Sequence, residues 1–275
     1  MPDHKSPNSI HAATYAARRR RLLLAIGGIT LTAVVAPHLL DGPEEQAPGQ
    51  HGLTAPREMP VHRELAAHRN LAAYRTPRYP LDRPLYYIDN ADKAIALTID
   101  DGPDPVYTPQ VLEVLRTYRV TATFSMIGLH VAAYPQLARA VAEAGHRIAN
   151  HTWTHADLAG LRPRRVHSEL TLASHAIHAA TGVHPGLFRA PYGAWSPTVL
   201  RLCEHMRMIP VDWSVDPRDW ARPGVQHIVR TIMKTTQPGS IILEHDGGGN
   251  RAETVRALRI VLPRLLAEGY HFETP

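Results

Sequence analysis

The sequence contains a single cysteine, Cys203, among its 275 residues. One thiol excludes an intramolecular disulfide, and it also excludes zinc sites that are built from several cysteines. A metal bound to this chain would therefore have to use histidine and carboxylate ligands. The sequence holds 18 histidines and 25 acidic residues, so such ligands are plentiful.

The sequence also has few lysines and little net charge. Only Lys5, Lys93 and Lys234 are lysines among the 30 basic residues, which we interpret as codon bias rather than phosphate recognition. Residues 1–84 hold 11 basic against 7 acidic residues, and residues 85–275 hold 19 against 18. The longer segment is nearly neutral and lacks the basic footprint of a nucleic-acid-binding domain, so we expect no nucleic-acid partner.

Charged residues are absent from one long stretch near the N-terminus. Residues 22–40 follow Arg18–Arg21 and are just numerous enough to cross a bilayer. The basic flank predicts that residues 1–21 stay in the cytoplasm. Two interpretations remain open, an uncleaved membrane anchor or an export signal cleaved near Val34–Ala36. Both place the rest of the chain outside the cytoplasm, either released toward the cell wall or anchored to the membrane.

The remaining sequence divides into a linker and a regular domain. Residues 41–84 are rich in proline, histidine, arginine and glutamate, which is typical of a linker. Over residues 85–275, apolar strand-like runs alternate with helical patterns. The expected strands are 94–99, 122–127, 147–150, 187–189, 208–212, 240–244 and 270–273; the expected helices are 108–118, 135–144, 164–181, 196–205, 225–235 and 252–268. This alternation predicts a parallel barrel or an open α/β sheet, with its active site at the C-terminal strand ends.

Two motifs at expected strand ends suggest a metal site. Asp100 and Asp101 follow an apolar run, and adjacent carboxylates repel each other unless a cation neutralises one. His151 and His155 are spaced i, i+4, which predicts one face of a helical turn that can chelate one ion. One carboxylate and two histidines form the ligand set of a catalytic zinc or other divalent site, and the spare carboxylate can serve as a base. Chance pairing of histidines and an ordinary Asp-Asp-Gly-Pro turn are the competing interpretations.

Three further segments place ionisable side chains at strand ends. His245 lies beside Asp246, and a neighbouring carboxylate raises the pKa of a histidine, as a general acid requires. Arg189 can bind a carboxylate through two N–H groups. The segment Asp216–Trp220 offers carboxylates and an aromatic wall. Taken singly, each segment is explained at least as well by a structural role.

The order of these segments is more specific than any one of them. Together they resemble the five ordered motifs of the polysaccharide deacetylase family, carbohydrate esterase family four, whose shared unit is called the NodB homology domain. The five segments are Thr98–Pro103, His151–His155, Arg189–Tyr192, Asp216–Trp220 and Leu243–Asp246. The resemblance covers roughly residues 85–275 as the catalytic domain, and it implies a distorted (β/α) barrel with about seven parallel strands.

The resemblance also implies a metal-dependent deacetylase and a division of labour. Asp101, His151 and His155 are implied to bind a divalent metal, usually zinc, with cobalt or manganese as alternatives. Asp100 is implied to be the general base that activates the hydrolytic water.

Further roles follow for the second half of the chain. Arg189 is implied to orient Asp100 and to be held in turn by Asp219. The backbone N–H of Tyr192 is implied to stabilise the oxyanion of the reaction.

The last implied roles concern the leaving group and the acetyl pocket. His245 is implied to be the general acid, tuned by Asp246 or another carboxylate, while Trp220 and Leu243 line the pocket for the acetyl methyl. An earlier Asp-Trp pair, Asp212-Trp213, competes with Asp219-Trp220, and we favour the second pair because Asp216-x-x-Asp219-Trp220 fits the motif better.

The implied substrate is a glycan, and we expect a monomer acting on it. Because the chain carries an export or anchor segment, the N-acetyl groups of N-acetylglucosamine in peptidoglycan are the first choice. Chitin or chito-oligosaccharides come second and acetylated xylan third. Two other readings stay open, a metal-dependent hydrolase of a non-sugar amide and a catalytically silent, membrane-anchored glycan-binding protein.

Overall fold

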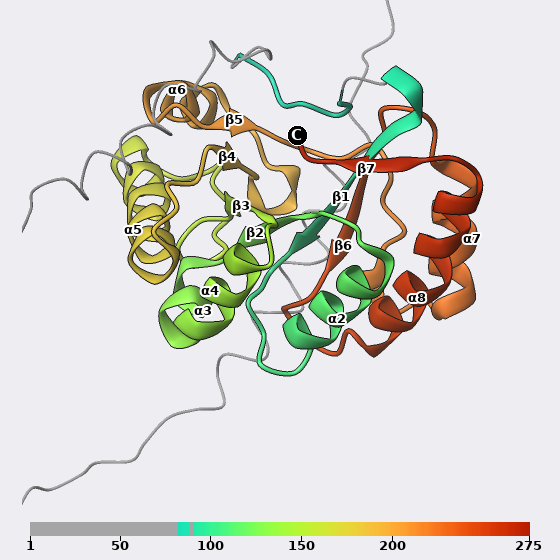
Figure 1. Ribbon diagram of the computed structural model, residues 1–275. Coiled ribbons are helices and arrows are strands. Elements are labelled where there is room, and N and C mark those ends of the chain that lie inside the picture. Colours follow the sequence, from blue (N-terminus) through green and yellow to red (C-terminus); the bar gives the residue numbers. More distant parts are fainter. Residues whose placement is uncertain (1–81, 89–90) are drawn as a thin grey trace, which may run out of the picture. The chain divides into compact units, whose positions relative to one another are not determined.

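Figure 1 shows the fold of the computed structural model, which describes residues 82–88 and 91–275. Residues 1–21, which we predicted to stay in the cytoplasm, lie outside the described residues, as do the apolar segment 22–40 and almost all of the predicted linker 41–84. Within the described part of the chain, no helix has the length and apolar character needed to span a membrane.

In the described part of the chain, seven parallel strands form the sheet. They are β1 (Ala94–Asp100), β2 (Thr123–Met126), β3 (Arg147–Asn150), β4 (Leu187–Phe188), β5 (Ile209–Pro210), β6 (Ile241–His245) and β7 (His271–Glu273). Their spatial order is β5-β4-β3-β2-β1-β6, and β7 pairs with the first half of β1. β1 is the central strand, and all seven of its residues are buried.

The helices lie around the outside of the strands (Figure 1). They are α2 (Thr108–Tyr118), α3 (Gly128–Ala133), α4 (Pro135–Glu143), α5 (Pro163–Thr181), α6 (Pro197–His205), α7 (Val225–Thr235) and α8 (Ala252–Ala267), with short 3₁₀ turns η3 (Ala91–Lys93), η4 (Pro191–Gly193) and η5 (Asp219–Ala221). Several start at proline, whose fixed φ suits the first helical turn, and α5 ends before Gly182 at φ 73°.

The sheet curls, and isolated bridges close it between β5 and β6. The Leu85 N–H donates to Pro210 O at 2.8 Å, and the Ile88 N–H donates to Gly239 O at 2.9 Å. Beyond β5, the chain crosses to β6, where the Leu243 N–H donates to Val215 O at 2.9 Å. The expected distorted barrel with about seven parallel strands is confirmed.

Alternation along β1 separates two cores. Ile95, Leu97 and Ile99 face the helices and join the main apolar cluster with residues of α2, α4, α7 and α8. Ala94 and Ala96 face the barrel interior, where the small residues leave room for side chains from β4 and β6. Because side chains alternate along a strand, Thr98 and Asp100 point into the same interior. They lie near the carboxyl end of β1.

The elements match the sequence-based expectation closely, apart from short additions. Helix α3 was not predicted, because Gly128–Ala133 is only 6 residues long and runs into the next helix through Tyr134. The 3₁₀ turns were missed as well. The bridges made by Leu85 and Tyr87 were missed because they are isolated pairs at the very start of the predicted domain, where no strand-like run marks them.

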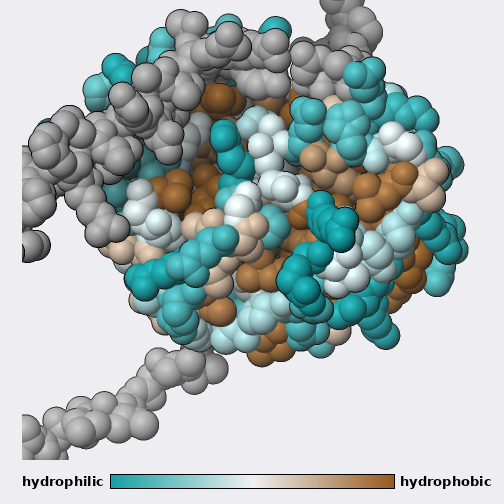
Figure 2. All heavy atoms as spheres, in the orientation of Figure 1, coloured by the Kyte–Doolittle hydropathy of each residue, from teal (hydrophilic) through white to brown (hydrophobic). Residues whose placement is uncertain are grey.

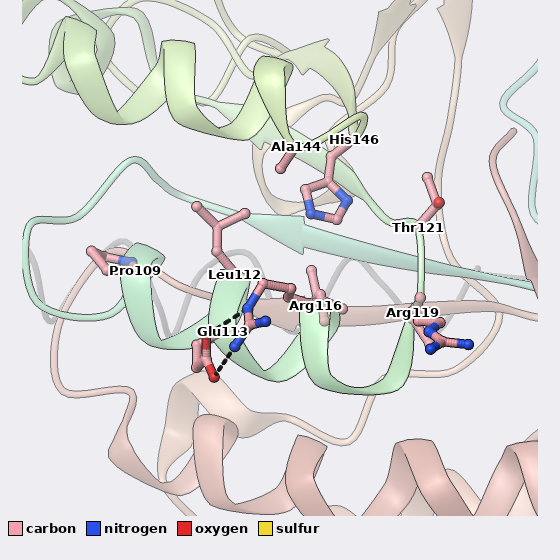
Figure 3. Close-up of a pocket in the computed structure, with 10 residues that line it drawn as sticks. Pro109, Leu112, Glu113, Arg116, Arg119, Thr121, Ala144 and His146 are labelled. Atoms are coloured by element: carbon pink, nitrogen blue, oxygen red, sulfur yellow. Dashed lines mark hydrogen bonds and ion pairs between the residues drawn. The ribbon is translucent and has the colours of Figure 1, made fainter.

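One surface pocket lies away from the carboxyl ends of the strands. This pocket of about 590 Å³ runs along α2 and the connections into β2 and β3, lined by residues such as Leu112, Arg116 and His146 (Figure 3). Within it, Arg116 pairs with Glu113 at 2.8 Å. The face in Figure 2 shows hydrophilic side chains with hydrophobic ones between them. None of the predicted site residues lines this pocket.

Candidate active site

Residues from all five motifs converge on the carboxyl ends of the strands. Asp100 is the last residue of β1 and His245 the last of β6, and the two are register partners in neighbouring strands. His151 directly follows β3, and Arg189 directly follows β4. Because all strands run parallel, these ends lie at one edge of the sheet, where active sites of such folds are found.

Three buried residues form a compact set of metal donors. Asp101, His151 and His155 each offer one ligand atom, and these atoms all lie within 4.8 Å of one another. Asp101 Oδ1 is 3.1 Å from His155 Nε2 and 3.7 Å from His151 Nε2. One carboxylate oxygen with two imidazole nitrogens matches a catalytic divalent-metal site. No other such group of three or more donors occurs among residues 82–88 and 91–275.

The two histidines meet without forming a helical turn. Residues 151–158 are an irregular loop, in which Thr152 has φ 67° and His155 has φ 59°. The ring centroids of His151 and His155 are 4.9 Å apart. The expectation of a shared helix face was therefore wrong in its conformation, because left-handed backbone turns bring the two rings together instead.

Protonation in this cluster suits a bound cation. Burial lowers the pKa of His151 to about 4, against the opposing effect of the Asp100 carboxylate, so the ring is neutral at neutral pH. Burial raises the pKa of Asp101, but the neighbouring His155, His245 and His151 together outweigh burial and hold that pKa well below its ordinary value. Neutral imidazole and ionised carboxylate are the forms that bind metal, so the donor set fits a divalent ion.

Asp100 is held by a buried arginine. Arg189 Nη1 donates to Asp100 Oδ1 at 2.9 Å and to Thr98 Oγ1 at 2.7 Å. The other carboxylate oxygen, Asp100 Oδ2, lies 3.8 Å from His151 Nε2. One oxygen is thus fixed by the guanidinium, while the other faces the metal donors and remains positioned to accept a proton.

Arg189 is itself fixed by main-chain carbonyls. Its Nη2 donates to Asp212 O at 2.8 Å, and its Nε donates to Val211 O at 3.3 Å. We expected Asp219 to hold Arg189, and this expectation was wrong. The chain beyond β5 crosses the barrel directly beneath the guanidinium, so its carbonyl oxygens take the place predicted for a carboxylate.

Asp219 instead binds His245. Its Oδ1 lies 2.7 Å from His245 Nδ1, and its Oδ2 accepts the His245 N–H at 2.9 Å and the Thr254 hydroxyl at 2.6 Å. Burial lowers the pKa of His245, but the Asp219 carboxylate outweighs burial and raises it to about 9. The histidine is therefore protonated at neutral pH, the form that a general acid requires.

Of the two options expected for tuning His245, Asp246 or another carboxylate, the structure favours the second, because Asp246 is bonded elsewhere. Its Oδ2 accepts the Thr108 hydroxyl at 2.5 Å. Its carboxyl also packs against Gly102, where a Cβ atom would clash with it. Asp246 therefore braces the turn after Asp101, and the structure assigns the tuning of His245 to Asp219.

Comparison with known proteins agrees with this arrangement. A family model described as polysaccharide deacetylase matches residues 88–210. A chitooligosaccharide deacetylase from Bradyrhizobium sp. (strain ANU 289) is 45% identical over 190 residues, which cover 65% of this chain and 87% of that protein. The chain belongs to the polysaccharide deacetylase family. The resemblance inferred from the five motifs and the assignment as a deacetylase are confirmed.

A second relative carries a different substrate name. A peptidoglycan-N-acetylglucosamine deacetylase from Bacillus cereus (strain ATCC 14579) is 42% identical over 189 residues, covering 68% of this chain and 88% of that protein. Two relatives of comparable sequence identity are therefore named for two different glycan substrates. Sequence identity alone does not distinguish between chito-oligosaccharides and peptidoglycan as the substrate of this deacetylase.

Solved structures show that the fold occurs with and without activity. A crystal structure of a peptidoglycan N-acetylglucosamine deacetylase matches with TM-score 0.67 and 30% identity, covering 69% of this chain and 89% of that one. A family pseudoenzyme from Bacillus anthracis matches with TM-score 0.66 and 27% identity, covering 70% and 67%. Turnover within this fold therefore depends on the residues at the site rather than on the fold alone.

Hydrogen bonds behind the metal donors orient both rings. The His151 Nδ1 lies 2.8 Å from Arg189 O, and because a carbonyl only accepts, Nδ1 carries the proton and Nε2 is free to ligate. His155 Nδ1 lies 3.1 Å from the Tyr192 hydroxyl. Arg189 therefore supports the base with its side chain and one metal ligand with its backbone.

Two polar residues that the sequence did not single out hold the histidine loop on α5. The Asn150 side chain donates to Leu170 O at 2.7 Å and accepts the Thr152 N–H at 2.8 Å. The buried Glu169 carboxylate accepts the Thr154 N–H at 2.8 Å. Asn150 directly precedes His151 at a strand end, so its polarity was a usable signal; Glu169 lies inside a helical pattern and gave none.

The remaining predicted residues lie around the same strand ends. Tyr192 has φ 63°, and its ring packs edge-on against His155 at 4.7 Å. Leu243 is buried in β6, two residues before His245 and on the same face. Trp220 lies under the Arg218 guanidinium at 5.0 Å from the ring centroid. The oxyanion role of the Tyr192 N–H and the pocket roles of Leu243 and Trp220 stay predictions.

The competing Asp-Trp pair has a separate place in the fold. Asp212 Oδ2 accepts the Trp195 indole N–H at 2.8 Å, and burial raises the pKa of Asp212 to about 6. The Trp213 ring lies 5.6 Å from the Arg189 guanidinium. Asp212 therefore connects the loop after β4 to the chain beyond β5. Asp219, in contrast, contacts His245, the proposed general acid. This contact supports the choice of Asp219-Trp220 for the fourth motif.

Proposed function

We propose that this chain hydrolyses the N-acetyl group of N-acetylglucosamine units in peptidoglycan. The observation that carries the proposal is the presence of two opposite proton-transfer groups at one set of metal donors. Asp100 is held ready to accept a proton, and His245, its register partner, is held ready to give one. Amide hydrolysis needs both, because water must lose a proton and the leaving amine must gain one.

Asp101, His151 and His155 would hold the metal, which we propose to be zinc. Two imidazoles and one carboxylate suit zinc, and cobalt or manganese can occupy the same ligand set. When bound, the metal supplies Lewis-acid polarisation of the acetyl carbonyl and lowers the pKa of water toward neutrality.

Asp100 performs the first proton transfer in this proposal. Arg189 fixes one oxygen of the carboxylate, and the Thr98 hydroxyl accepts from the same arginine nitrogen, so the other Asp100 oxygen keeps one orientation toward the metal donors. The proton removed from the attacking water is held on that oxygen. The Tyr192 N–H is proposed to stabilise the oxyanion that results.

His245 performs the second proton transfer. The leaving group of an N-acetyl substrate is an amine, a poor leaving group unless its nitrogen is protonated. His245 bears its labile proton on Nε2, because Nδ1 bonds to Asp219. The acetyl methyl is proposed to lie against Leu243 and Trp220, near the acid.

Peptidoglycan is preferred over other glycans because of the N-terminal sequence. Residues 22–40, preceded by Arg18–Arg21, are proposed to export the enzyme or to anchor it in the membrane, where it acts as a monomer. A Bacillus cereus peptidoglycan deacetylase at 42% identity supports this choice. Chito-oligosaccharides are the second candidate, favoured by the Bradyrhizobium relative at 45% identity.

One assay tests the proposal directly. The purified full-length chain is incubated with peptidoglycan, chito-oligosaccharides or acetylxylan, with and without a chelator, and released acetate is measured. We expect release from peptidoglycan that the chelator abolishes and that added Zn²⁺ restores. Release from chito-oligosaccharides alone would move the substrate to the second candidate. Release from none of the three glycans, by a chain that binds metal, would contradict deacetylase activity.

A further inference from the structure

Strand β6 holds an acidic residue where the pattern calls for an apolar one. Glu244 is the register partner of Ile99, and it lies two residues beyond Ile242 on the same face. Ile99 and Ile242 both belong to the apolar core between the sheet and the helices. Glu244 is 0% exposed, so its carboxyl lies inside that layer, on the side of β6 opposite to Leu243 and His245. Figure 1 shows β6 next to β1 at the centre of the fold.

The Glu244 carboxyl lacks an ordinary donor. Across the described ranges 82–88 and 91–275, no N–H or hydroxyl donor reaches either of its oxygens. Its hydrogen-bonding neighbour is another carboxyl, that of Asp219. Two ionised carboxylates repel at such a contact, so one of the two must carry a proton for the contact to form.

The hydrogen bonds to Asp219 decide which group is ionised. Asp219 accepts from three donors, namely the backbone and ring of His245 and the hydroxyl of Thr254. Burial raises the pKa of Asp219, but His245 outweighs it, and the result is lowered to about 2. Burial raises the pKa of Glu244 well above its ordinary value, and the Asp219 carboxylate raises it further. The proton therefore belongs to Glu244.

Other charged groups near Glu244 do not reverse this assignment. Asp216 is a second negative neighbour and disfavours ionisation of Glu244. Arg251 is the neighbouring cation, but its Nε donates to Gly247 O at 2.7 Å and its Nη1 to Trp220 O at 3.3 Å. The guanidinium is thus directed at backbone carbonyls.

We propose that Glu244 is a positioning residue that remains protonated during turnover and donates a hydrogen bond to Asp219. Glu244 then fixes Asp219 from the side opposite to His245, and the three residues form a chain Glu244–Asp219–His245. Because Glu244 is neutral, it orients the carboxylate without adding a second negative charge. The inference rests on the proposed function, since it deepens the role of His245.

Infrared spectroscopy tests the protonation state without any turnover. A protonated carboxylic acid has a carbonyl stretch that a carboxylate lacks. At the pH of maximal activity, we expect the difference spectrum of wild type minus Glu244→Gln to contain this band. The matched control is Glu204→Gln, the same change at an exposed position of α6, which should not remove the band. Absence of the band from the first difference spectrum would overturn the proposal, whether or not the protein deacetylates any glycan.

Kinetics test the positioning role. Glu244→Gln replaces a neutral donor by a neutral donor, so kcat and the alkaline limb of its pH profile should stay within about twofold of wild type. Glu244→Leu removes the donor and should lower kcat about tenfold at unchanged KM, because a hydrogen bond to a charged group is lost.

Two kinetic results would overturn the proposal. A shift of the alkaline limb to lower pH in Glu244→Gln would mean that the substitution removed a negative charge, and hence that Glu244 is ionised. An unchanged kcat in a folded Glu244→Leu would mean that the bond to Asp219 does not position His245. If Glu244→Leu does not fold, the infrared spectrum and the Glu244→Gln profile still decide the question.

Discussion

Two buried histidines at the strand ends differ in charge at neutral pH, although both are shielded from water. Burial lowers the pKa of His151 to about 4, and the ring donates to the Arg189 carbonyl. The pKa of His245 is raised to about 9, because Asp219 binds both its ring and its backbone N–H. One histidine is therefore a neutral ligand and the other a charged acid.

The difference lies in the hydrogen-bond partner of Nδ1 rather than in burial. A carbonyl oxygen orients the ring of His151 and leaves its second nitrogen as a lone pair for a cation. The Asp219 carboxylate bonds to the ring of His245 and stabilises its charged form. This stabilisation is larger than the destabilisation that burial causes. The split of the site into a metal half and an acid half follows from these two partners. Each of the first four variants below changes one half, and the fifth changes neither.

The largest effect is expected from Asp101→Asn, in the metal half. The substitution removes the charged ligand between His151 and His155, so metal affinity should fall and turnover should drop by about a thousandfold or more. Metal content and acetate release are measured on the same preparation. The control is Asp157→Asn, the same change at an exposed position of the loop, which should retain both. Wild-type metal content in Asp101→Asn would contradict the assignment.

A smaller effect is expected from His245→Gln, in the acid half. Loss of the acid should lower kcat by about a hundredfold to ten-thousandfold while the metal stays bound. The substrate can bypass the acid if its leaving group needs no proton. An activated acetate ester should therefore lose much less activity than the glycan, and an equal loss on both substrates would count against the acid role.

Asp219→Asn should shift the pH profile of the acid half. An acid is active while protonated, so wild-type activity is expected to fall as pH rises through about 9, the raised pKa of His245. Removing the carboxylate lowers that pKa, and the alkaline limb should move to lower pH by about one unit or more, with kcat down about tenfold to a hundredfold. An alkaline limb at the wild-type position would separate Asp219 from the titration of His245.

Asn150→Ala should weaken the metal half indirectly. The side chain holds Thr152 and is anchored on α5, so its loss should loosen the histidine loop and lower metal affinity about tenfold. A titration with Zn²⁺ against a competing chelator measures the change. The pH profile of the acid half should not move, and a shift in its alkaline limb would show that the two halves are not independent.

The smallest effect is expected from His178→Ala. His178 stacks on His184 with ring centroids 3.8 Å apart, on the far end of α5. Neither ring belongs to the group of metal donors found among the described residues. Metal content and turnover should both equal those of wild type, and a loss of metal would reveal a second site.

The fold was largely predictable because periodicity reports burial. The strand predicted over 94–99 and the helix predicted over 108–118 were bounded to within one residue. A continuous apolar run marks the strand, and the helical spacing of apolar residues marks the helix. The closure of the barrel by Leu85 and Val215 was not predictable. It consists of isolated bridges between segments far apart in sequence, and no local pattern encodes such pairs.

The site was predictable in its members but not in all its contacts. Strand-end position and motif order located Asp101, His151 and His245. The partner of Asp219 was predicted wrongly, because a motif lists residues and not the directions of their side chains. The role of Glu244 was invisible for a different reason: a glutamate between Leu243 and His245 looks like a surface residue until its burial is known.

The central claim is that Asp101 belongs to the metal while its neighbour Asp100 moves the proton. Asp100→Asn tests this most directly, with metal content and acetate release from the preferred glycan measured on one preparation. The account predicts wild-type metal content and a turnover lowered by about a hundredfold to ten-thousandfold. Wild-type turnover in this variant, or a loss of metal equal to that of Asp101→Asn, would contradict it.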